Sequence, residues 1–421
     1  MKEYLFKADI LLPDFKKIDG TKWATIACDQ FTSEPEYWEK ATAMVGESPS
    51  TLNLILPEVY LNEAKRRIPK INSAMTEYLK NILVEHKESM IYIEREQSDG
   101  KIRHGIIGLI DLEEYDYRKN SKSLIRATEG TVLERIPPRV AVRCDAPIEL
   151  PHIMLLIDDA SKTVIEPCTL EKSKYKIAYD FELMQKGGHV TGRFLNNEAV
   201  ERINAALCML ASPEEQCKKY GKCSENEKPL LFAVGDGNHS LACAKATYVQ
   251  NKIALGEDAL SHPSRYALVE VVNLHDDALE FEPIYRVLFN VNAEVVLNKL
   301  FEYAHYLKGC ECVQRVDYCS SICSGEIYFK NSECQLTVGT LQKFIDSFVA
   351  EYPATKVDYI HGEQALEILA RKKDTIGFIF KGIEKNELFK SVIIGGALPR
   401  KAFSMGHAED KKYYIEARCI K

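Results

Sequence analysis

Residues 230–246 read LLFAVGDGNHSLACAKA, and this stretch indicates the fold class of the chain. The apolar residues at its start are typical of a buried strand, and Gly235-Asp236-Gly237 predicts a tight turn. The residues after the turn favour a helix, which Asn238 or Ser240 can cap. A strand, a glycine turn and a helix in succession are typical of α/β architecture.

Segments of strand and helix character alternate on both sides of this stretch. Strands are predicted at 24–28, 102–110, 153–157, 230–234, 266–272, 376–380 and 388–394. Helices are predicted at 34–45, with a Ser33–Glu36 capping box, and at 57–84, 197–210, 239–249, 293–306, 341–352 and 363–371. The pattern predicts a mixed α and β (α+β) fold with several layers.

The chain has 421 residues, which favours about two or three domains. We place a boundary near residue 290, where helix and strand signals begin to alternate in shorter units. Residues 1–290 then form an N-terminal α/β core that carries the Asp-Gly-Asn-His-Ser loop, and residues 291–421 form a C-terminal α+β domain.

The composition narrows the class of protein. Hydrophobic residues make up 46% and charged residues 28%, as in soluble globular proteins, and the net charge of −7 does not favour nucleic acid or an anionic membrane as a partner. No apolar run approaches the length of a membrane span, and the start of the chain lacks a secretory signal. Thirteen cysteines without such a signal favour reduced thiols and a cytoplasmic protein.

The turn after the strand is the first candidate site. The first turn of a helix leaves backbone N–H groups without partners and carries partial positive charge, so it suits a phosphate. Asp236 beside a phosphate favours a divalent metal such as Mg²⁺, because a carboxylate is a hard oxygen ligand. His239 can donate to phosphate or transfer a proton. A plain strand-to-helix turn with a solvated histidine is the alternative interpretation.

An arginine-rich segment and several shorter stretches supply further candidates. Residues 126–143 read RATEGTVLERIPPRVAVR, where Arg126 and Arg135 could neutralise an anion and Glu129 could act as a base; a salt-linked surface is the alternative. Asp29 follows a predicted strand and could act as a base or metal ligand. Lys401 could meet a phosphate, and the glycines of 187–193 suit either a ligand or a hairpin turn.

Several of these stretches together resemble the family catalogued as domain of unknown function 1015. They are DGNHS, KIDGTKWATIACDQFTSEPEYW, LIRATEGTVLERIPPR, ELPHIMLLIDD, YDFELMQKGGHVTGR, LEFEPIYRVL and LPRKAFSMG, and they cover nearly the whole chain. The resemblance raises Arg126, Glu129 and Arg135 as site residues. It carries no assigned activity.

The Asp-Gly-Asn-His-Ser loop is also similar to loops of ParB-like proteins, sulfiredoxins and free-serine kinases. This similarity implies a ParB-like core that binds a nucleotide, ATP or ADP, through Gly235, Gly237, Asn238 and Ser240, and a serine-like substrate. The chain departs from the family loop Asp-Gly-His-His-Arg, because Asn238 replaces a histidine and Ser240 replaces the arginine. Losing that arginine removes a bidentate phosphate donor, which Lys245 or an arginine from elsewhere in the chain would have to replace.

These observations lead to two main hypotheses. In the first, the chain is a Mg²⁺- and nucleotide-dependent phosphotransferase on a small hydroxylated or amino-acid substrate, with Asp236, His239, Glu129 and Asp29 as catalytic candidates. In the second, the same loop binds a nucleotide or phosphometabolite without turnover. A redox role for Cys243 is a weaker third hypothesis. The spacing of the cysteines in 310–334 fits structural zinc poorly and favours buried thiols on strands. The sequence does not determine the oligomeric state.

Overall fold

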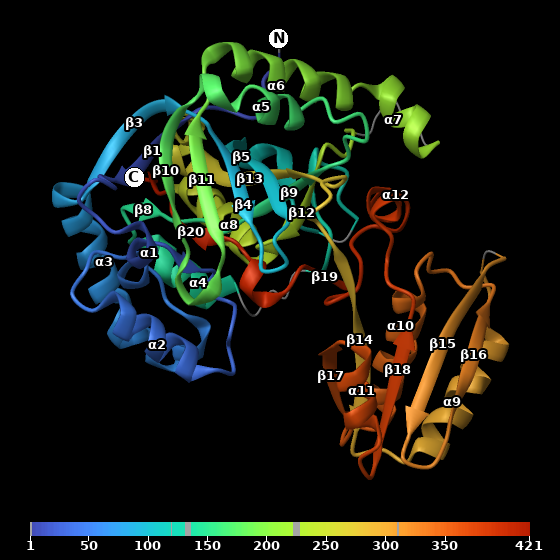
Figure 1. The fold of residues 1–421 in the computed structure, drawn as a ribbon. Coiled ribbons are helices and arrows are strands. Elements are labelled where there is room, and N and C mark those ends of the chain that lie inside the picture. Colours follow the sequence, from blue (N-terminus) through green and yellow to red (C-terminus); the bar gives the residue numbers. More distant parts are fainter. Residues whose placement is uncertain (1, 119, 131–135, 222–227, 310) are drawn as a thin grey trace. The chain divides into compact units, whose positions relative to one another are not determined.

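The computed structural model describes residues 2–421 except 119, 131–135, 222–227 and 310, and it also leaves the side chains of 136–139 undescribed. The chain divides into two compact units (Figure 1). The first comprises Met1–Ala127, Thr131–Leu279 and His407–Lys421, and the second comprises Thr128–Gly130 and Glu280–Gly406. The second unit thus begins before residue 290, because the strand Phe281–Phe289 pairs within it.

A nine-stranded mixed sheet forms the centre of the first unit. Its strands, in spatial order, are β10 (Lys176–Glu182), β11 (His189–Phe194), β4 (Ile91–Glu96), β5 (Ile102–Asp111), β13 (Tyr266–Asn273), β9 (Met154–Ile157), β12 (Phe232–Asp236), β7 (Ile125–Ala127) and β6 (Tyr115–Asp116). Strand β12 runs parallel to β7 and antiparallel to β9.

The first unit also contains three two-stranded sheets, and two of them include a strand from the C-terminal segment. They are β1 (Ala8–Pro13) with β3 (Leu83–Ser89), β2 (Thr25–Ile26) with β20 (Tyr413–Tyr414), and β8 (Ile148–Glu149) with β21 (Arg418–Cys419). The β2–β20 pair brings Tyr414 opposite Thr25, although almost the whole chain lies between them in sequence.

Helices cover both faces of the large sheet. They are α1 (Gly20–Trp23), α2 (Pro35–Val45), α3 (Ala64–Asn81), α4 (Ile136–Cys144), α5 (Glu166–Leu170), α6 (Asn197–Leu210), α7 (Pro213–Tyr220) and α8 (Asn238–Leu255). Short 3-10 helices occur at Thr51–Leu54, Glu58–Glu63, Leu112–Glu114, Lys172–Lys174, Met184–Lys186, Gly256–Leu260, Pro263–Arg265 and Ala408–Asp410.

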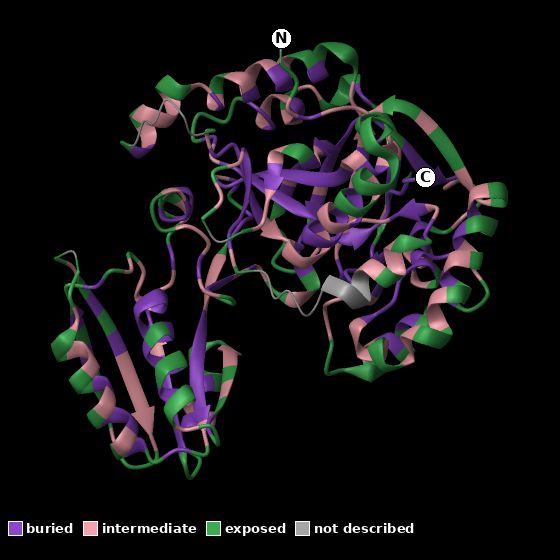
Figure 2. Ribbon diagram, turned by 180° about the vertical axis from the view of Figure 1, so that it is seen from behind, coloured by how far each residue is buried: buried purple, intermediate pink, exposed green. Residues whose placement is uncertain are grey.

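Alternating residues of the central strands point to opposite faces of the sheet and belong to two separate hydrophobic cores. Ile91 and Ile93 of β4 pack with α2 and α3, whereas Tyr92 between them packs with α6 and α8. This alternation follows from the two-residue period of a strand and makes the first unit three layers thick. Figure 2 shows the buried residues concentrated on the strands and the exposed residues on the outer helices.

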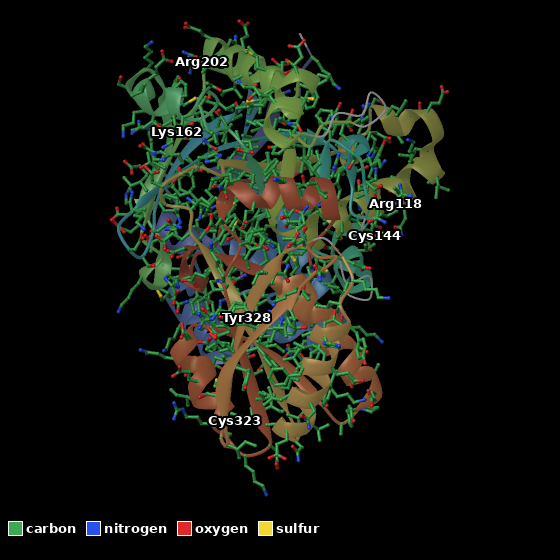
Figure 3. All side chains as sticks on the ribbon, turned by 90° about the vertical axis from the view of Figure 1, so that its right-hand side faces the viewer. Arg118, Cys144, Lys162, Arg202, Cys323 and Tyr328 are labelled. Atoms are coloured by element: carbon green, nitrogen blue, oxygen red, sulfur yellow. The ribbon has the colours of Figure 1, made fainter. Side chains whose placement is uncertain are left out.

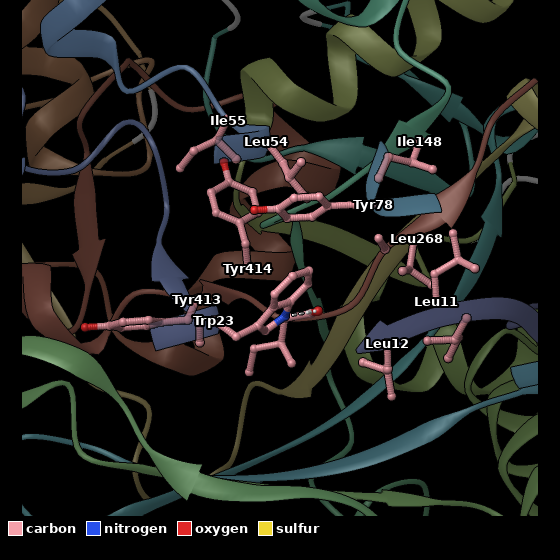
Figure 4. Close-up of a cluster of buried hydrophobic side chains, with 14 of the residues drawn as sticks. Leu11, Leu12, Trp23, Leu54, Ile55, Tyr78, Ile148, Leu268, Tyr413 and Tyr414 are labelled. Carbon is pink, nitrogen blue, oxygen red and sulfur yellow. Dashed lines mark hydrogen bonds between the residues drawn. The ribbon is translucent and has the colours of Figure 1, made fainter. Parts of the chain in front are cut away.

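One of these cores anchors the returning end of the chain. Trp23 is fully buried, and its indole Nε1–H donates to the carbonyl of Ile415 over 3.0 Å. Tyr413 and Tyr414 lie in the same cluster as Leu54 and Tyr78 (Figure 4). Strand β20 is therefore part of the core and holds Tyr414 in a fixed position.

The second unit is a smaller sheet with its own helices. Its strands, in spatial order, are β16 (Ser324–Lys330), β15 (Val313–Ser320), β18 (Thr375–Phe380), β14 (Phe281–Phe289) and β17 (Lys356–His361), and β19 (Phe403–Met405) also pairs with β14. Its helices are α9 (Ala293–Tyr306), α10 (Thr337–Glu351), α11 (Glu363–Ala370) and α12 (Lys385–Gly395).

Most of the elements predicted from the sequence are confirmed. The fold is mixed α and β, with 40% helix and 29% strand in the described structure. The strand predicted at 388–394 is wrong, because these residues lie in α12, where Leu388, Phe389 and Val392 are buried at helical spacing. The Ser33–Glu36 capping box is also wrong, because α2 begins at Pro35 without a side-chain cap. No helix among the described residues is long and apolar enough to cross a membrane.

Candidate functional site

The junction between β12 and α8 is built as the sequence predicts. Gly237 is the N-cap of α8 and has a φ of +78°, and a Cβ atom there would lie 3.0 Å from the Cα of Ile153. Only glycine adopts this conformation at little cost. Since a glycine offers no capping side chain, α8 starts at Asn238 with its first-turn amides uncapped by the residue before it, and the positive end of an eighteen-residue helix lies there.

Lys411 supplies a cation at this junction. The Nζ of Lys411 lies 3.4 Å from Oδ2 of Asp236, and the two side chains are only 12% and 20% exposed. Oδ1 of Asp236 accepts a hydrogen bond of 2.8 Å from the backbone N–H of Gly237. The charge of Lys411 also acts on Asp29. A lysine from the C-terminal segment therefore brings positive charge to the loop that has Ser240 in place of an arginine.

Lys245 does not have that role. Its Nζ donates to the carbonyl of Leu112 over 2.7 Å and lies 5.9 Å from the ring centroid of Tyr248. The lysine inside α8 thus ties the helix to the segment after β5.

A second polar group lies next to the junction and contains Asp29. The Nε2 atom of His152 lies 3.4 Å from Oδ2 of Asp29 and 3.4 Å from Oγ of Ser240. The imidazole is 4% exposed, and its Nδ1 lies 2.7 Å from the hydroxyl of Tyr414. That hydroxyl lies 3.2 Å from Sγ of Cys28, to which it can donate. Asp29, His152, Tyr414, Cys28 and Ser240, which we call the His152 cluster, form one connected network.

The surroundings of Asp29 keep it ionised. Burial alone would raise the pKa of its carboxyl group, but the charge and hydrogen bond of His152, the amide of Gln30 and the charge of Lys411 outweigh that effect and hold the pKa well below its usual value. A carboxylate with a lowered pKa is a weak base. Asp29 is therefore better suited to orient His152 than to remove a proton itself.

The His152 cluster differs from a serine hydrolase triad. In such a triad the serine and the aspartate contact opposite nitrogens of the histidine. Here Ser240 and Asp29 share Nε2, and Tyr414 contacts Nδ1. The geometry supports proton transfer at Nε2 without activating Ser240 as a nucleophile.

A pocket of about 150 Å³ adjoins the His152 cluster. Its lining includes Cys28, His152, Ser240 and Tyr414 from the cluster, and Cys243 from the next turn of α8. The first turn of α8 therefore forms part of the pocket wall. Small-molecule sites often combine apolar walls with a few placed polar groups in this way.

The other predicted site residues have contacts of their own. Arg126 on β7 is 5% exposed, and its guanidinium donates to the carbonyls of Ser123 and Lys228, each over 2.8 Å. Glu129 and Lys401 meet in the second unit, where the carboxylate of Glu129 accepts from the backbone N–H groups of Lys401 and Ala402, each over 3.0 Å. Arg135 lies outside the described residues.

The remaining loop residues frame the junction. Gly235 lies on β12, and Asn238 and His239 are half-buried in the first turn of α8. Oδ1 of Asn238 is enclosed and has no hydrogen-bond partner among the described residues. The glycines at 187 and 188 form the turn between β10 and β11, as the hairpin interpretation predicts.

No cluster of three or more His, Cys, Asp or Glu side chains that could hold a metal exists in the described part of the chain. The cysteines at 312, 319, 323 and 334 are free thiols, and Cys323 lies at the β15–β16 turn (Figure 3). Cys243 is not disulfide-bonded and is 4% exposed, whereas Cys217 is disulfide-bonded. The low exposure of Cys243 does not favour a redox role.

The chain belongs to the family described as "Protein of unknown function (DUF1015)", whose model matches residues 12–393. This confirms the resemblance seen in the sequence. No curated protein matches the chain.

Several solved structures are similar in fold. A variant of free serine kinase in complex with ADP shares 12% identity at a TM-score of 0.38, covering 76% of this chain and 93% of its own. A conserved hypothetical protein from Pyrococcus furiosus shares 10% identity at a TM-score of 0.34, with coverages of 73% and 97%. SbnI from Staphylococcus aureus, truncated at its C-terminus, shares 10% sequence identity at a TM-score of 0.34, and the match covers 71% of this chain and 82% of SbnI. Similarity this low carries no argument about function.

Proposed function

We propose that the first unit is a nucleotide- and Mg²⁺-dependent phosphotransferase that acts on a small hydroxylated substrate. The observation that carries this proposal is that Ser240 belongs both to the first turn of α8 and to the wall of the pocket. A phosphate held by the amides of that turn would face a molecule in the pocket. Phosphoryl transfer depends mainly on such positioning and on charge stabilisation.

The junction offers positive charge for the phosphates. The N-terminus of α8 and the ammonium of Lys411 both favour an anion. Asp236 fits a Mg²⁺ ion that arrives with a nucleotide, since this ion is often bound by one or two carboxylates together with phosphate oxygens. Bound there, Mg²⁺ would neutralise charge on the phosphates, and Lys411 would turn from Asp236 toward them.

His152 is the base in this proposal, in place of Asp29 or Glu129. Its Nε2 lies beside Ser240 on the pocket wall, where the neutral ring with its proton on Nδ1 can accept the proton of a substrate hydroxyl. Asp29 stabilises the imidazolium that forms, and Tyr414 fixes the plane of the ring through Nδ1. The proposal assigns no role in transfer to Arg126, whose guanidinium donates to the carbonyls of Ser123 and Lys228.

One observation favours a second candidate, binding of a nucleotide or phosphometabolite without turnover. Lys411 already pairs with the carboxylate that would hold the metal, and Ser240 brings no charge to the loop. A site that keeps this pair would bind phosphates without Mg²⁺. Turnover therefore separates the two candidates.

The test begins with calorimetric titration of ATP, ADP and AMP, each with and without Mg²⁺. Lys411→Met removes a charge from the junction and is expected to weaken ADP binding about tenfold, whereas Asp236→Asn is expected to remove the Mg²⁺ dependence. Lys228→Met, which breaks an exposed pair with Glu114, is the matched control. Unchanged affinity in Lys411→Met would overturn the assignment of the junction.

Consumption of ATP in the presence of hydroxylated acceptors then separates the candidates. Acceptor-dependent release of ADP that needs Mg²⁺ supports the phosphotransferase. Tight binding with no turnover for any acceptor supports the binding protein.

A further inference from the structure

The walls of the pocket are mainly apolar, which limits what it can hold. These walls are formed by Leu54, Ile55, Leu56, Leu61, Met75, Val142, Ala146, Ile148, Leu150, Pro151 and Ile153. The volume of about 150 Å³ is similar to that of a cavity that accepts benzene. A molecule with a compact apolar body matches both the size and the lining.

Arg143 is the basic side chain of this wall. It extends from α4, its side chain is 14% exposed, and it forms an ion pair with Glu149. Its Nε–H is buried and has no hydrogen-bond partner among the described residues. Leaving a buried donor of a charged group unpaired is costly, so the site gains stability when an acceptor enters.

The neighbours of Arg143 do not use up its charge. The carboxylate of Glu149 also accepts from Nε of Arg418 over 2.6 Å and from the backbone N–H of Leu268 over 3.1 Å. Two guanidinium groups therefore share one carboxylate, and the pKa of Glu149 is lowered although burial opposes this. Glu58 is the other acidic residue on the pocket wall.

We infer that the pocket binds a small carboxylic acid with an apolar body, and that Arg143 binds its carboxylate. A carboxylate supplies the acceptor that Nε–H lacks, and guanidinium and carboxylate groups match in geometry. Glu58 on the same wall disfavours a ligand with a second anionic group, because its carboxylate repels such a group. The binding of this acid does not require phosphoryl transfer, whereas its role as the acceptor, through a hydroxyl near His152, rests on the proposed function.

The experiment uses four molecules with one carbon skeleton and no nucleotide. They are 4-methylpentanoate, its 2-hydroxy derivative, its 2-amino derivative leucine, and the uncharged 4-methylpentanamide. Calorimetric titration of the full chain is expected to show that the carboxylates bind about tenfold to a hundredfold more tightly than the amide, since they pair with Arg143. The hydroxy and amino acids are compared to find the preferred α-substituent.

Arg143→Met is expected to abolish the preference for carboxylate over amide and to leave the amide affinity unchanged. Arg202→Met is the matched control, since Arg202 forms an ion pair with Glu171 and does not line the pocket. Ala146→Leu fills part of the cavity and is expected to weaken all four ligands, which tests the location even if Arg143→Met does not fold.

Two results would overturn the inference: equal binding of acid and amide to the wild-type chain, or an unchanged preference in Arg143→Met. Neither result depends on nucleotide binding at α8. Conversely, a chain that binds these acids but no nucleotide would retain this inference and lose the proposed function.

Discussion

Asp29 in the first unit and Glu129 in the second are both half-buried carboxylates, yet their surroundings give them opposite properties. Asp29 contacts the imidazole of His152, and its pKa is lowered. Glu129 accepts from two backbone amides, and burial raises its pKa despite them. A carboxylate within a polar network on a pocket wall can assist chemistry, whereas one that satisfies backbone amides holds a loop in place.

The surroundings of Glu129 fit this structural role. Residues Thr128–Gly130 exchange backbone hydrogen bonds with Leu398 on both sides of Glu129, over 2.7 Å and 3.1 Å. The carboxylate of Glu129 also accepts hydrogen bonds in the turn at Lys401, a residue with a positive φ of 54°. These contacts support a structural role for Glu129, whereas the proposed function involves Asp29.

The largest expected effect tests the functional region. His152→Gln removes the proposed base and is expected to lower the rate of phosphoryl transfer about 10²-fold to 10⁴-fold, with nucleotide affinity unchanged. His275→Gln is the control, because it breaks another histidine–aspartate pair of the first unit, with Asp158 at 2.7 Å. Equal loss of rate in both variants would show that the effect is structural.

The next prediction tests the structural region. Glu129→Ala leaves two backbone amides without their acceptor and is expected to cost about 2 kcal/mol of local stability in the second unit. Hydrogen exchange at the amides of Lys401 and Ala402 measures this loss directly. The rate of phosphoryl transfer is expected to be unchanged. A large loss of this rate with little change in hydrogen exchange would instead indicate that Glu129 acts as a base.

The pH dependence of stability distinguishes the two carboxylates by sign. The pKa of Asp29 is lower in the folded chain than its usual 3.8, so its ionisation stabilises the fold above that value, and the gain is lost as the pH falls through the lowered pKa. The pKa of Glu129 is raised above 4.5, so its ionisation costs stability as the pH rises through 4.5 to the folded value.

Asp29→Asn is therefore expected to destabilise the chain more at about pH 7 than at about pH 3, whereas Glu129→Gln is expected to be less harmful, or stabilising, at the higher pH. Urea unfolding of each variant against wild type at both pH values measures the difference. The same sign for both variants would contradict the comparison.

The smallest expected effect concerns Ser240. Its Oγ lies 3.4 Å from Nε2 of His152, a long contact, so Ser240→Ala is expected to lower the transfer rate about fivefold or less. A loss as large as that of His152→Gln would mean that the serine itself reacts.

The local pattern of the sequence predicted most elements and the shape of the loop. The run at 230–246 has an apolar strand, a glycine that must adopt positive φ, and a helix start, and all three are local properties. The strand predicted at 388–394 failed because Val392 and its isoleucine neighbours suggested a strand, whereas the capping box of Glu384 and Glu387 marks a helix.

The rest of the candidate site depends on contacts between residues that are far apart in the sequence, and a local sequence pattern does not contain such contacts. Asp29 was among the candidates predicted from the sequence, but its partner His152 lies in the stretch 149–159, where the sequence indicated only a strand and a family resemblance. Lys411 and Tyr414 come from the far end of the chain, and no motif marked them. The contacts of Arg126 with the carbonyls of Ser123 and Lys228 likewise become visible only in the fold.

The return of His407–Lys421 to the first unit has a consequence for how the protein is made. A ribosome completes the entire second unit before it adds Lys411 and Tyr414, so until then the junction at α8 lacks its cation and His152 lacks its ring partner. The newly made first unit must wait for β20 to enter beside β2. The His152 cluster is therefore completed only after the second unit has been synthesised.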